Sequence, residues 1–364
     1  MSGELHSEVS SERKQPQFHG AYSVLRQAIA EEAFPGCAFG VFANGGILLE
    51  DALGHFTYDS LASAVTSKTL YDIASLTKVI CTTATAMLLY QRGLLDLETP
   101  LGELLPGFVI CRDDSRWARR VTLRHLLAHS SGLPGYVPFF HTATTSYAVL
   151  RGCLELPIEA EPGTRAEYSD PGFILLGKAL EAVLNESLPT FAHREVFAPL
   201  EMSHTGFCPP PSIRPEIPPT EEDELYRQRR IQGEVQDEHA YLLKGAAGHA
   251  GLFSNVPDLL RFSKAILEPA LFDARTIDTF SERQPPPGSS RALGWDTPSL
   301  DSSSGQFFSS NSIGHLGYSG CSLWIDREAQ LAVVLLTNRT WPHRESQLIR
   351  SVRPAFHDAI REAL

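Results

Sequence analysis

Apolar and polar residues follow one another along the first part of the chain in patterns that predict a helix and a hairpin. Residues 19–33 have helical periodicity, and two short apolar runs, 37–42 and 47–50, then have the composition of strands. Asn44, Gly45 and Gly46 lie between these runs and supply the residue types that a tight turn requires. The N-terminal part of the chain is therefore expected to contribute a helix and two strands.

The last part of the chain repeats this arrangement in the opposite order. Residues 322–326 and 330–337 form a second apolar hairpin pattern around 327–329, and a helical pattern occupies 345–364. The middle of the chain has mainly helical periodicity, at 76–92, 122–128, 171–183 and 257–267. Between these segments lie loops rich in proline and glycine.

These patterns predict an α+β fold in which an antiparallel sheet is built from both chain termini, is flanked by helices and carries a mainly helical second region. We expect a flexible tail at 1–18 and one domain at 19–364. Its α/β part covers about 19–75 and 290–364, and its helical part about 76–289. Residues 209–224 hold six prolines and an acidic run, which favours an extended, solvated loop.

Composition narrows the possible partners. The chain has 364 residues, 43% of them hydrophobic, and a formal net charge of −12, which opposes binding to nucleic acid or to anionic lipid. The polar N-terminus lacks the apolar stretch of a secretory signal, and no run is long enough to span a membrane. A cytoplasmic location is expected, or a periplasmic or secreted one if a signal was removed. The six scattered cysteines are expected to be free thiols, and the oligomeric state stays open.

Ser75 and Lys78 are the first candidates for chemistry. On a helix, residues three apart share one face with their side chains about 5–6 Å apart. The spacing alone is weak evidence, because Ser11 and Lys14 repeat it in the polar tail. Ser75, however, follows a strand-like segment and opens a long apolar helix, so burial is expected to lower the pKa of Lys78 enough for it to act as a base. The alternative is a serine helix cap beside a solvated lysine.

Two further segments are candidates for the same active site when they are considered together with Ser75 and Lys78. Tyr168, Ser169 and Asp170 precede an apolar helical segment, and on their own they favour a capping turn with a half-buried aromatic residue. The segment 315–318, His-Leu-Gly-Tyr, stands before the strand at 322–326, where a glycine allows close approach of a ligand to the backbone. On its own it favours a glycine-rich strand entry with a surface histidine.

The order of these segments resembles the active-site elements of serine β-lactamases and penicillin-binding proteins. Ser75-x-x-Lys78, Tyr168-Ser169-Asp170 and His315-Leu316-Gly317 occupy the three places. The resemblance extends to the segments 129–134, 248–254 and 293–295 and covers roughly residues 20 to 345. It is nearest to the class C branch, with its esterases and low-molecular-weight carboxypeptidase-like proteins. It implies a β-lactamase/transpeptidase-like fold.

The resemblance also implies roles for individual residues. Ser75 would be the nucleophile, and Lys78 and Tyr168 the base that takes its proton. The main-chain N–H groups of Ser75 and Tyr318 would form the oxyanion hole, and water would hydrolyse the acyl-enzyme. Asp170, His315, Leu316 and Gly317 would contact the substrate, a small ester or peptide.

Two departures from the family pattern point toward the substrate. His315 and Leu316 stand where lactamases and peptidases usually carry a lysine and a hydroxyl residue that recognise a carboxylate. Asp170 replaces an asparagine and cannot donate a hydrogen bond when ionised, although it could hold Lys78. We therefore expect a carboxylesterase-type hydrolase of small esters. The alternatives are a D-alanyl-D-alanine carboxypeptidase or weak β-lactamase, and a non-catalytic penicillin-sensor-like protein.

Other signals are weaker. His125 and His129 have the spacing of a zinc pair but lack the glutamate and a third ligand, so a hydrogen-bonded structural pair is favoured. For His249 a structural role near the site entrance is likewise favoured, and the acidic stretch 233–238 either lines the cleft or forms a solvated turn. No GxSxG elbow or phosphate-binding loop is present. We expect no metal and no cofactor.

Overall fold

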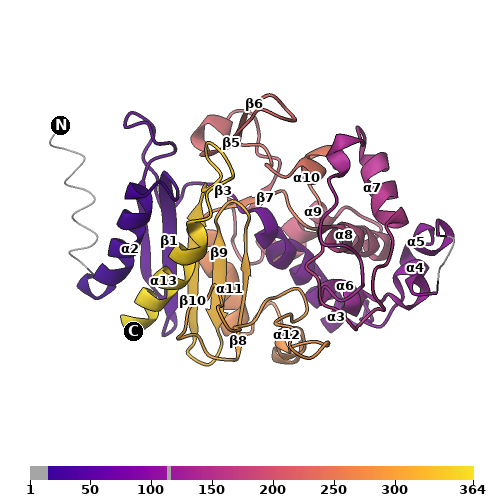
Figure 1. The fold of residues 1–364 in the computed structure, drawn as a ribbon. Helices are drawn as coiled ribbons and strands as arrows, with labels where there is room; N and C mark the ends of the chain where they lie inside the picture. The colour runs from indigo at the N-terminus through magenta and orange to yellow at the C-terminus, as the bar shows by residue number, and fades with distance from the viewer. Residues whose placement is uncertain (1–14, 113–115) are drawn as a thin grey trace.

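A five-stranded antiparallel sheet forms the centre of one half of the molecule (Figure 1). The computed structural model describes residues 15–112 and 116–364. The strand order is β2-β1-β10-β9-β8, so strands from both ends of the chain make one sheet. The strands are β1 (Gly36–Ala43), β2 (Gly46–Gly54), β8 (Ser312–Leu316), β9 (Ser322–Asp326) and β10 (Leu331–Thr337). The predicted fold class is confirmed, with both predicted hairpins in place.

Helices cover both faces of this sheet. Alternate side chains of β1 and β10 point to opposite faces, and on one face they meet α2 (His19–Ala30) and α13 (Ile349–Glu362) in a core centred on Phe39 and Phe356. Figure 1 shows these two terminal helices side by side. The other face packs against α11 (Val256–Leu267), which joins it to a larger core shared with the helical region. Burial on both faces explains why these strands are continuously apolar.

The second half of the molecule is mainly helical, as predicted. Its longest helix, α8 (Asp170–Leu184), is buried among its neighbours and begins at a Ser169 cap. The other helices are α3 (Ala84–Gln91), α4 (Leu101–Leu104), α5 (Gly107–Ile110), α6 (Leu123–Leu127), α7 (Ser146–Glu155), α9 (Leu188–Ala192), α10 (Glu238–Leu242) and α12 (Ala274–Ser281). Small strands complete it: β3 (Tyr71–Asp72), β4 (Gly206–Phe207) and β7 (Leu252–Ser254) form one sheet, and β5 (Pro219–Asp223) and β6 (Arg229–Gln232) another.

The segment predicted as one helix at 76–92 is divided into three parts. A 3₁₀ turn, η2 (Ala74–Leu76), is followed by a π-helical stretch, η3 (Lys78–Thr83), and then by α3. Side-chain hydroxyls contribute to this irregularity, because Thr77 Oγ1 donates to Ala74 O at 2.6 Å and Thr82 Oγ1 donates to Gly248 O at 2.6 Å. Such wide turns are frequent at functional sites.

The expected solvated loop at 209–224 is wrong for its second half. Strand β5 is buried and pairs with β6, and its acidic side chains have cationic partners. Asp223 is bonded to Arg227 at 3.0 Å, and Glu221 to Arg344 at 2.7 Å. The acidic residues of this segment therefore form ion pairs within the protein, and the composition of the segment alone does not reveal these partners.

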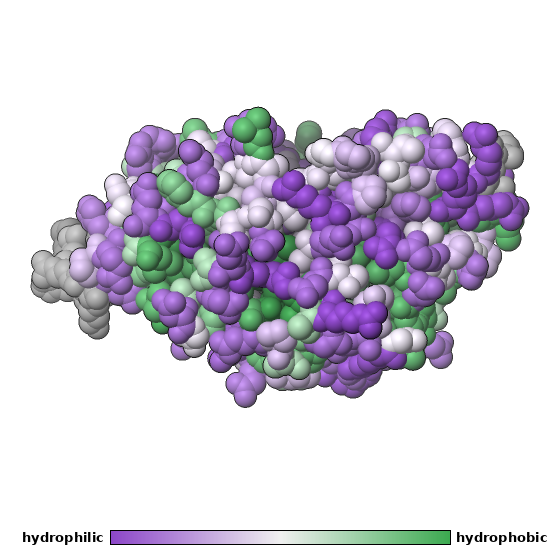
Figure 2. Space-filling model, turned by 90° about the horizontal axis from the view of Figure 1, so that it is seen from below, coloured by the Kyte–Doolittle hydropathy of each residue, from purple (hydrophilic) through white to green (hydrophobic). Residues whose placement is uncertain are grey.

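The ends and the surface complete the description. Residues 1–14 of the predicted tail lie outside the described residues, whereas Pro16–Phe18 form a 3₁₀ turn whose Phe18 is buried. All six cysteines are free, four of them buried. In the described ranges no helix is long and apolar enough to cross a membrane. Figure 2 shows polar and charged side chains over most of the face seen from below, with small apolar groups between them.

Candidate active site

A pocket of about 710 Å³ opens between the β8 edge of the large sheet and the first residues of α8, α10 and α13. Its lining contains seven residues that the sequence singles out: Ser75, Tyr168, Asp170, His315, Leu316, Gly317 and Tyr318. Lys78 lies behind Ser75 and is fully buried. The structure thus brings three distant segments of the chain to one site.

The loop that carries Ser75 is held by the carboxylate of Asp72. Asp72 Oδ1 accepts the N–H of Ala74 at 2.9 Å, and Oδ2 accepts the N–H of Gln236 at 2.7 Å. Ala74 has a φ of 48°, a left-handed conformation that costs energy for a residue with a Cβ. Burial raises the pKa of Asp72 to about 6. The turn before Ser75 is therefore strained, and the buried side chain of Asp72 holds it in place.

Lys78 is surrounded by hydrogen-bond acceptors. Its Nζ lies 3.0 Å from Ser75 Oγ, 2.7 Å from Asp170 Oδ1 and 3.1 Å from the main-chain oxygen of His249. Burial alone lowers the pKa of Lys78, but the Asp170 carboxylate, with a smaller contribution from Tyr168, raises it above the ordinary lysine value. The expected lowered pKa is therefore wrong: Asp170 keeps Lys78 protonated. An ammonium group, which only donates, suits a site lined by acceptors.

Tyr168 completes the group around the nucleophile. Its hydroxyl takes part in hydrogen bonds with Lys78 and Ser75, and Lys78 Nζ lies 4.8 Å from the ring centroid. Burial raises the pKa of Tyr168, and the positive charge of Lys78 offsets part of this rise. The phenol is placed by its neighbour Ser169, which caps α8 by accepting the N–H of Gly172 at 3.0 Å.

His129 supports Tyr168 from the side. The two rings are 4.5 Å apart, and His129 Nδ1 accepts the N–H of Ser169 at 2.9 Å. Burial, with the nearby charge of Arg291, holds the pKa of His129 well below its ordinary value, so the ring is neutral. His125 instead bonds to Thr122 at the start of α6. The two histidines thus have separate hydrogen-bond partners, as the structural interpretation of this motif requires.

The third triplet forms one wall, but for reasons that differ from the prediction. A Cβ on Gly317 would lie 2.5 Å from Ile73 O, so the glycine permits close approach of the protein backbone itself. His315 is 2% exposed, which excludes the alternative of a surface histidine. Its Nδ1 donates to Leu316 O at 2.8 Å, and burial keeps its pKa well below the usual range. His315 therefore supplies no positive charge.

Two arginines hold the loop that follows this triplet. Arg353, buried at the start of α13, donates to the carbonyls of Gly317 at 2.7 Å and Cys321 at 2.8 Å. Arg339 donates to Tyr318 O at 2.8 Å and lies 4.4 Å from the Tyr318 ring centroid. These bonds hold the main chain around Tyr318 in place beside the pocket that Ser75 also lines.

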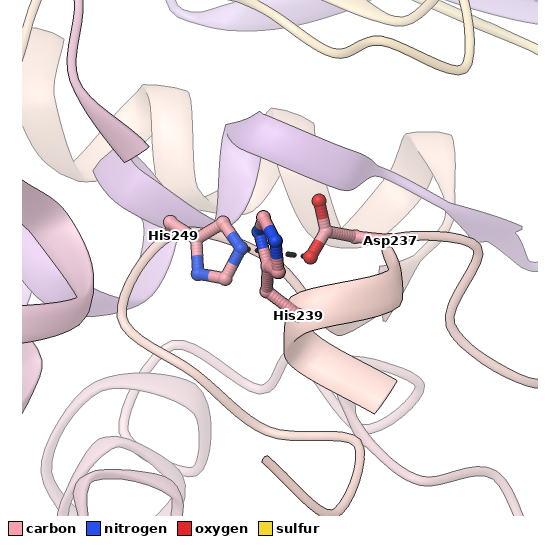
Figure 3. Close-up of side chains that lie close together, drawn as sticks. All are labelled: Asp237, His239 and His249. Carbon is pink, nitrogen blue, oxygen red and sulfur yellow. Dashed lines mark hydrogen bonds and ion pairs between the residues drawn. The ribbon is translucent and has the colours of Figure 1, made fainter. Parts of the chain in front are cut away.

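One group within the described residues has the composition of a metal site. Asp237, His239 and His249 place one ligand atom each within 4.8 Å of the others, and Figure 3 shows the Asp237 carboxylate and the His249 ring facing each other beside His239. His249 Nε2 bonds to Asp237 Oδ1 at 2.8 Å, and His239 Nε2 accepts the Phe139 N–H at 3.1 Å. The Nε2 lone pair of His239 is therefore used by the main chain, which leaves Nδ1 as the nitrogen of this ring that could face a metal. The hydrogen bond between His249 and Asp237 holds the other two side chains together.

Sequence reasoning missed several residues of the site. Arg291 lines the pocket, and its only sequence signal is that it precedes the motif at 293–295 by two residues. Asp72 and Arg353 act on main-chain groups of distant loops, and no short-range pattern marks such contacts. Asp237 and Glu238 do line the pocket, which decides between the two interpretations of the stretch 233–238.

The arrangement can carry out acyl transfer. A hydroxyl nucleophile lies beside a phenol that can relay protons and an ammonium group that stabilises negative charge. Ser75 and Tyr318, whose main-chain N–H groups are the predicted oxyanion donors, both line this pocket.

Comparisons with known proteins agree with this geometry. The family described as Beta-lactamase matches residues 23–353 of the chain. The N-acetylmuramyl-L-alanine amidase of Bacillus subtilis (strain 168) is 30% identical over 345 residues, which cover 84% of this chain and 77% of that protein. A Salmonella typhimurium protein named for D-alanyl-D-alanine carboxypeptidase is 28% identical over 352 residues, 86% of this chain and 80% of its own. The structure of EstCE1, a hydrolase with promiscuous acyltransferase activity, superposes with a TM-score of 0.78 at 21% identity, covering 96% of this chain and 99% of that one.

Proposed function

Because the chain belongs to the β-lactamase family of serine hydrolases, we propose that it hydrolyses small carboxylic esters through an acyl-enzyme on Ser75. One observation carries this proposal: Ser75 Oγ, Lys78 Nζ and the Tyr168 hydroxyl form one hydrogen-bonded group at a pocket. The resemblance to EstCE1, a hydrolase with promiscuous acyltransferase activity, supports acyl transfer, and the substitution of His315 and Leu316 for a carboxylate-binding pair supports a neutral ester as the substrate.

The proton movements follow from the pKa shifts. Lys78 is held protonated by Asp170 and does not serve as the base. Because its pKa is raised, Tyr168 is a neutral phenol and acts as a relay: it gives its own proton to the leaving oxygen, as the ester bond breaks, while it takes the proton of Ser75, whose Oγ bonds to the acyl carbon. The ammonium of Lys78 stabilises the negative charge that develops on the phenol oxygen during this relay. In deacylation, water gives its proton to Tyr168 and Ser75 regains one.

Intact-mass spectrometry with an aryl acetate tests the proposal. The wild-type protein is expected to gain one acetyl group and to turn over, and Ser75→Ala is expected to do neither. Ser351→Ala, at an exposed position on α13, is the matched control and should behave as wild type. Absence of both adduct and turnover in the wild type would overturn the proposal.

The names of the amidase and carboxypeptidase relatives favour a second candidate, an amide substrate such as a peptide ending in D-alanyl-D-alanine. A panel of one aryl ester, one such peptide and one β-lactam, compared by kcat/KM, separates the two. Preference for the peptide would replace the esterase assignment. A stable adduct without turnover on every compound would instead indicate a sensor.

A further inference from the structure

Strand β8 is at the edge of the large sheet, and its end and the residues after it line the catalytic pocket. An edge strand presents main-chain N–H and C=O groups to which an extended peptide can add as a further strand. Gly314 shows such pairing on the open side of β8, because it accepts the N–H of Asp296 at 2.8 Å and donates to Asp296 O at 2.9 Å. Side chains and main-chain groups alternate along a strand, so Leu316 and Tyr318 are the next residues whose main-chain groups a peptide would meet.

The carbonyls along this part of the wall already accept hydrogen bonds from side chains of the protein. Three such bonds follow one another: His315 Nδ1 to Leu316 O at 2.8 Å, Arg353 Nη2 to Gly317 O at 2.7 Å and Arg339 Nε to Tyr318 O at 2.8 Å. The main-chain N–H of Tyr318, in contrast, has no partner among the residues that the structure describes. This wall therefore offers a ligand a main-chain donor, whereas each of its carbonyls is already occupied.

Arg339 is the donor at Tyr318 O, and it lines the pocket itself. Its Nη1 donates to Arg344 O and Ser346 O, both at 3.0 Å, and Nη2 makes no hydrogen bond within the described ranges. A carbonyl oxygen has two lone pairs, but a second donor at Tyr318 O would approach the positive charge of the guanidinium. The space beside Tyr318 O therefore suits a hydrogen-bond acceptor better than an N–H group.

The pairing of antiparallel strands identifies the part of a substrate that would meet Arg339. In a hydrogen-bonded pair, two opposite residues exchange both of their N–H···O bonds. In the proposed mechanism the scissile carbonyl accepts the N–H of Tyr318, so an amide N–H on the same substrate residue would be directed at Tyr318 O. Every acyl group that derives from an N-acylated amino acid carries this N–H, and an acyl group with oxygen at the same place lacks it. Arg339 therefore lies where these two kinds of acyl group differ.

We infer that Arg339 makes the site select acyl groups that carry an oxygen acceptor, rather than an amide N–H, on the carbon next to the scissile carbonyl. This inference rests on the proposed acyl-enzyme at Ser75 and names a substrate class for it, the esters of alkoxy- and acyloxy-substituted acids. The oxygen can accept a hydrogen bond from the guanidinium, whereas an N–H must compete with Arg339 for Tyr318 O or stay unpaired. Peptides carry this N–H on their acyl residue and should be the poorer substrates.

Two phenyl esters that differ in a single group test the inference: phenyl acetoxyacetate, and phenyl N-acetylglycinate, in which an N–H replaces the oxygen. Release of phenol gives kcat/KM for each ester, and division by the rate constant of alkaline hydrolysis removes the difference in intrinsic reactivity. In this corrected ratio the wild type is expected to favour the oxygen ester by about tenfold or more, since one unpaired hydrogen-bonding group discriminates at that level.

Variants of Arg339 connect the preference to the guanidinium. Arg339→Met should reduce the corrected ratio by about tenfold, because Tyr318 O becomes free to accept the N–H of the glycine ester. Arg339→Lys keeps a charged donor and should give a ratio between those of the wild type and Arg339→Met. Arg151→Met, on the surface of α7 with Glu155 as its ion-pair partner, is the matched control and should keep the wild-type ratio. Phenyl acetate, which carries neither group, reports whether each variant is folded and active.

The possible outcomes separate this inference from the proposed function. A wild-type ratio near one, or a preference for the glycine ester, would overturn the inference and leave the esterase in place, because both esters would still be hydrolysed. A ratio that Arg339→Met leaves unchanged would overturn it as well. If Arg339→Met does not hydrolyse phenyl acetate, the ratio in Arg339→Lys decides instead and must fall below that of the wild type. Hydrolysis of no ester by the wild type, with no acyl group on Ser75, would overturn the proposed function and the inference with it.

Discussion

At the scale of single residues, the pairing of Lys78 with Asp170 decides the chemistry. Sequence reasoning treats a buried lysine as a candidate base, because burial disfavours its charge. The carboxylate at 2.7 Å reverses this effect and fixes the ammonium beside Ser75. In the proposed mechanism Tyr168 is then the group that relays protons, and Asp170 acts through Lys78 as a positioning residue.

Asp170→Asn is expected to shift the pH profile of kcat/KM toward lower pH. Without the carboxylate, burial dominates and the pKa of Lys78 falls, so the active ammonium form is lost at a lower pH on the alkaline side. Hydrolysis of an aryl acetate measured between about pH 5 and 10 checks this. A profile that keeps its alkaline limb in place would show that Asp170 does not control the protonation of Lys78.

At the scale of elements, the end of β8 lies against the nucleophile loop with little space between them. The Cβ that an alanine would add at Gly317 meets the main-chain oxygen of Ile73 at 2.5 Å, and backbone cannot move aside as a side chain can. Ser319 Oγ adds a 2.7 Å hydrogen bond to Asp72 O on the same loop. The distance from Ser75 to the Tyr318 N–H is therefore set by direct contact of two backbone segments.

Gly317→Ala should lower both stability and kcat. The added methyl group forces the end of β8 away from the nucleophile loop, at a cost of about 1–3 kcal/mol in the free energy of unfolding. Because the oxyanion donors separate, kcat should fall by more than KM rises. Urea unfolding and ester kinetics measure the two effects. Gly206→Ala, where the new Cβ would have no neighbour within 4 Å, is the control, and an equal loss in both variants would refute the explanation.

The C-terminal helix α13 acts on the same wall through Arg353. Arg353→Met keeps much of the side-chain volume but leaves the carbonyl of Gly320 without a donor, and it removes one of two donors from the carbonyls of Gly317 and Cys321. An unpaired buried polar group costs about 1–3 kcal/mol, so we expect a loss of that size in the free energy of unfolding. Arg350→Met, exposed on the same helix, should cost much less. Thermal or urea denaturation of both variants gives the comparison.

At the scale of the whole molecule, Asp72 connects segments that are far apart in the sequence. It lies on β3 and bonds to the nucleophile loop, to Gln236 before α10 and, through its main-chain oxygen, to Ser319 after β8. The two halves of the domain and the sheet edge therefore meet at one buried carboxyl group. We therefore expect the protonation state of Asp72 to change the free energy of unfolding of the whole domain.

The stability contribution of Asp72 should decrease as pH rises. Its pKa is raised from 3.8 to about 6 in the folded state, so folding favours the protonated form. The contribution is complete below the unfolded pKa and is lost as pH rises through 6. Between about pH 4.5 and 7.5 the difference in unfolding free energy between wild type and Asp72→Asn should change by about 2 kcal/mol. The wild type should become less stable relative to the variant as the pH rises. Urea titrations across this range test it; a constant difference would contradict the raised pKa.

The sequence predicts the architecture better than the contacts within the site. Period-two and apolar patterns locate the strands of both hairpins, and the ordered motifs locate Ser75, Tyr168 and His315 in one pocket. What it misses depends on neighbours far along the chain: the reversed pKa shift of Lys78, the buried acidic strand β5, and the role of Gly317 against Ile73. Arg291 was missed for the same reason, since its relation to Tyr168 exists only after folding.

The strand order β2-β1-β10-β9-β8 also constrains when a newly made chain can become active. Ser75 leaves the ribosome early, but β1 must wait for β10, and the wall at Gly317 and Tyr318 is synthesised only near the end. During most of its synthesis the polypeptide thus carries the proposed nucleophile without the proposed oxyanion hole. Catalytic competence should emerge in a single step, when the last strands close the sheet, and ribosome-bound fragments that stop before β8 should be inert toward esters.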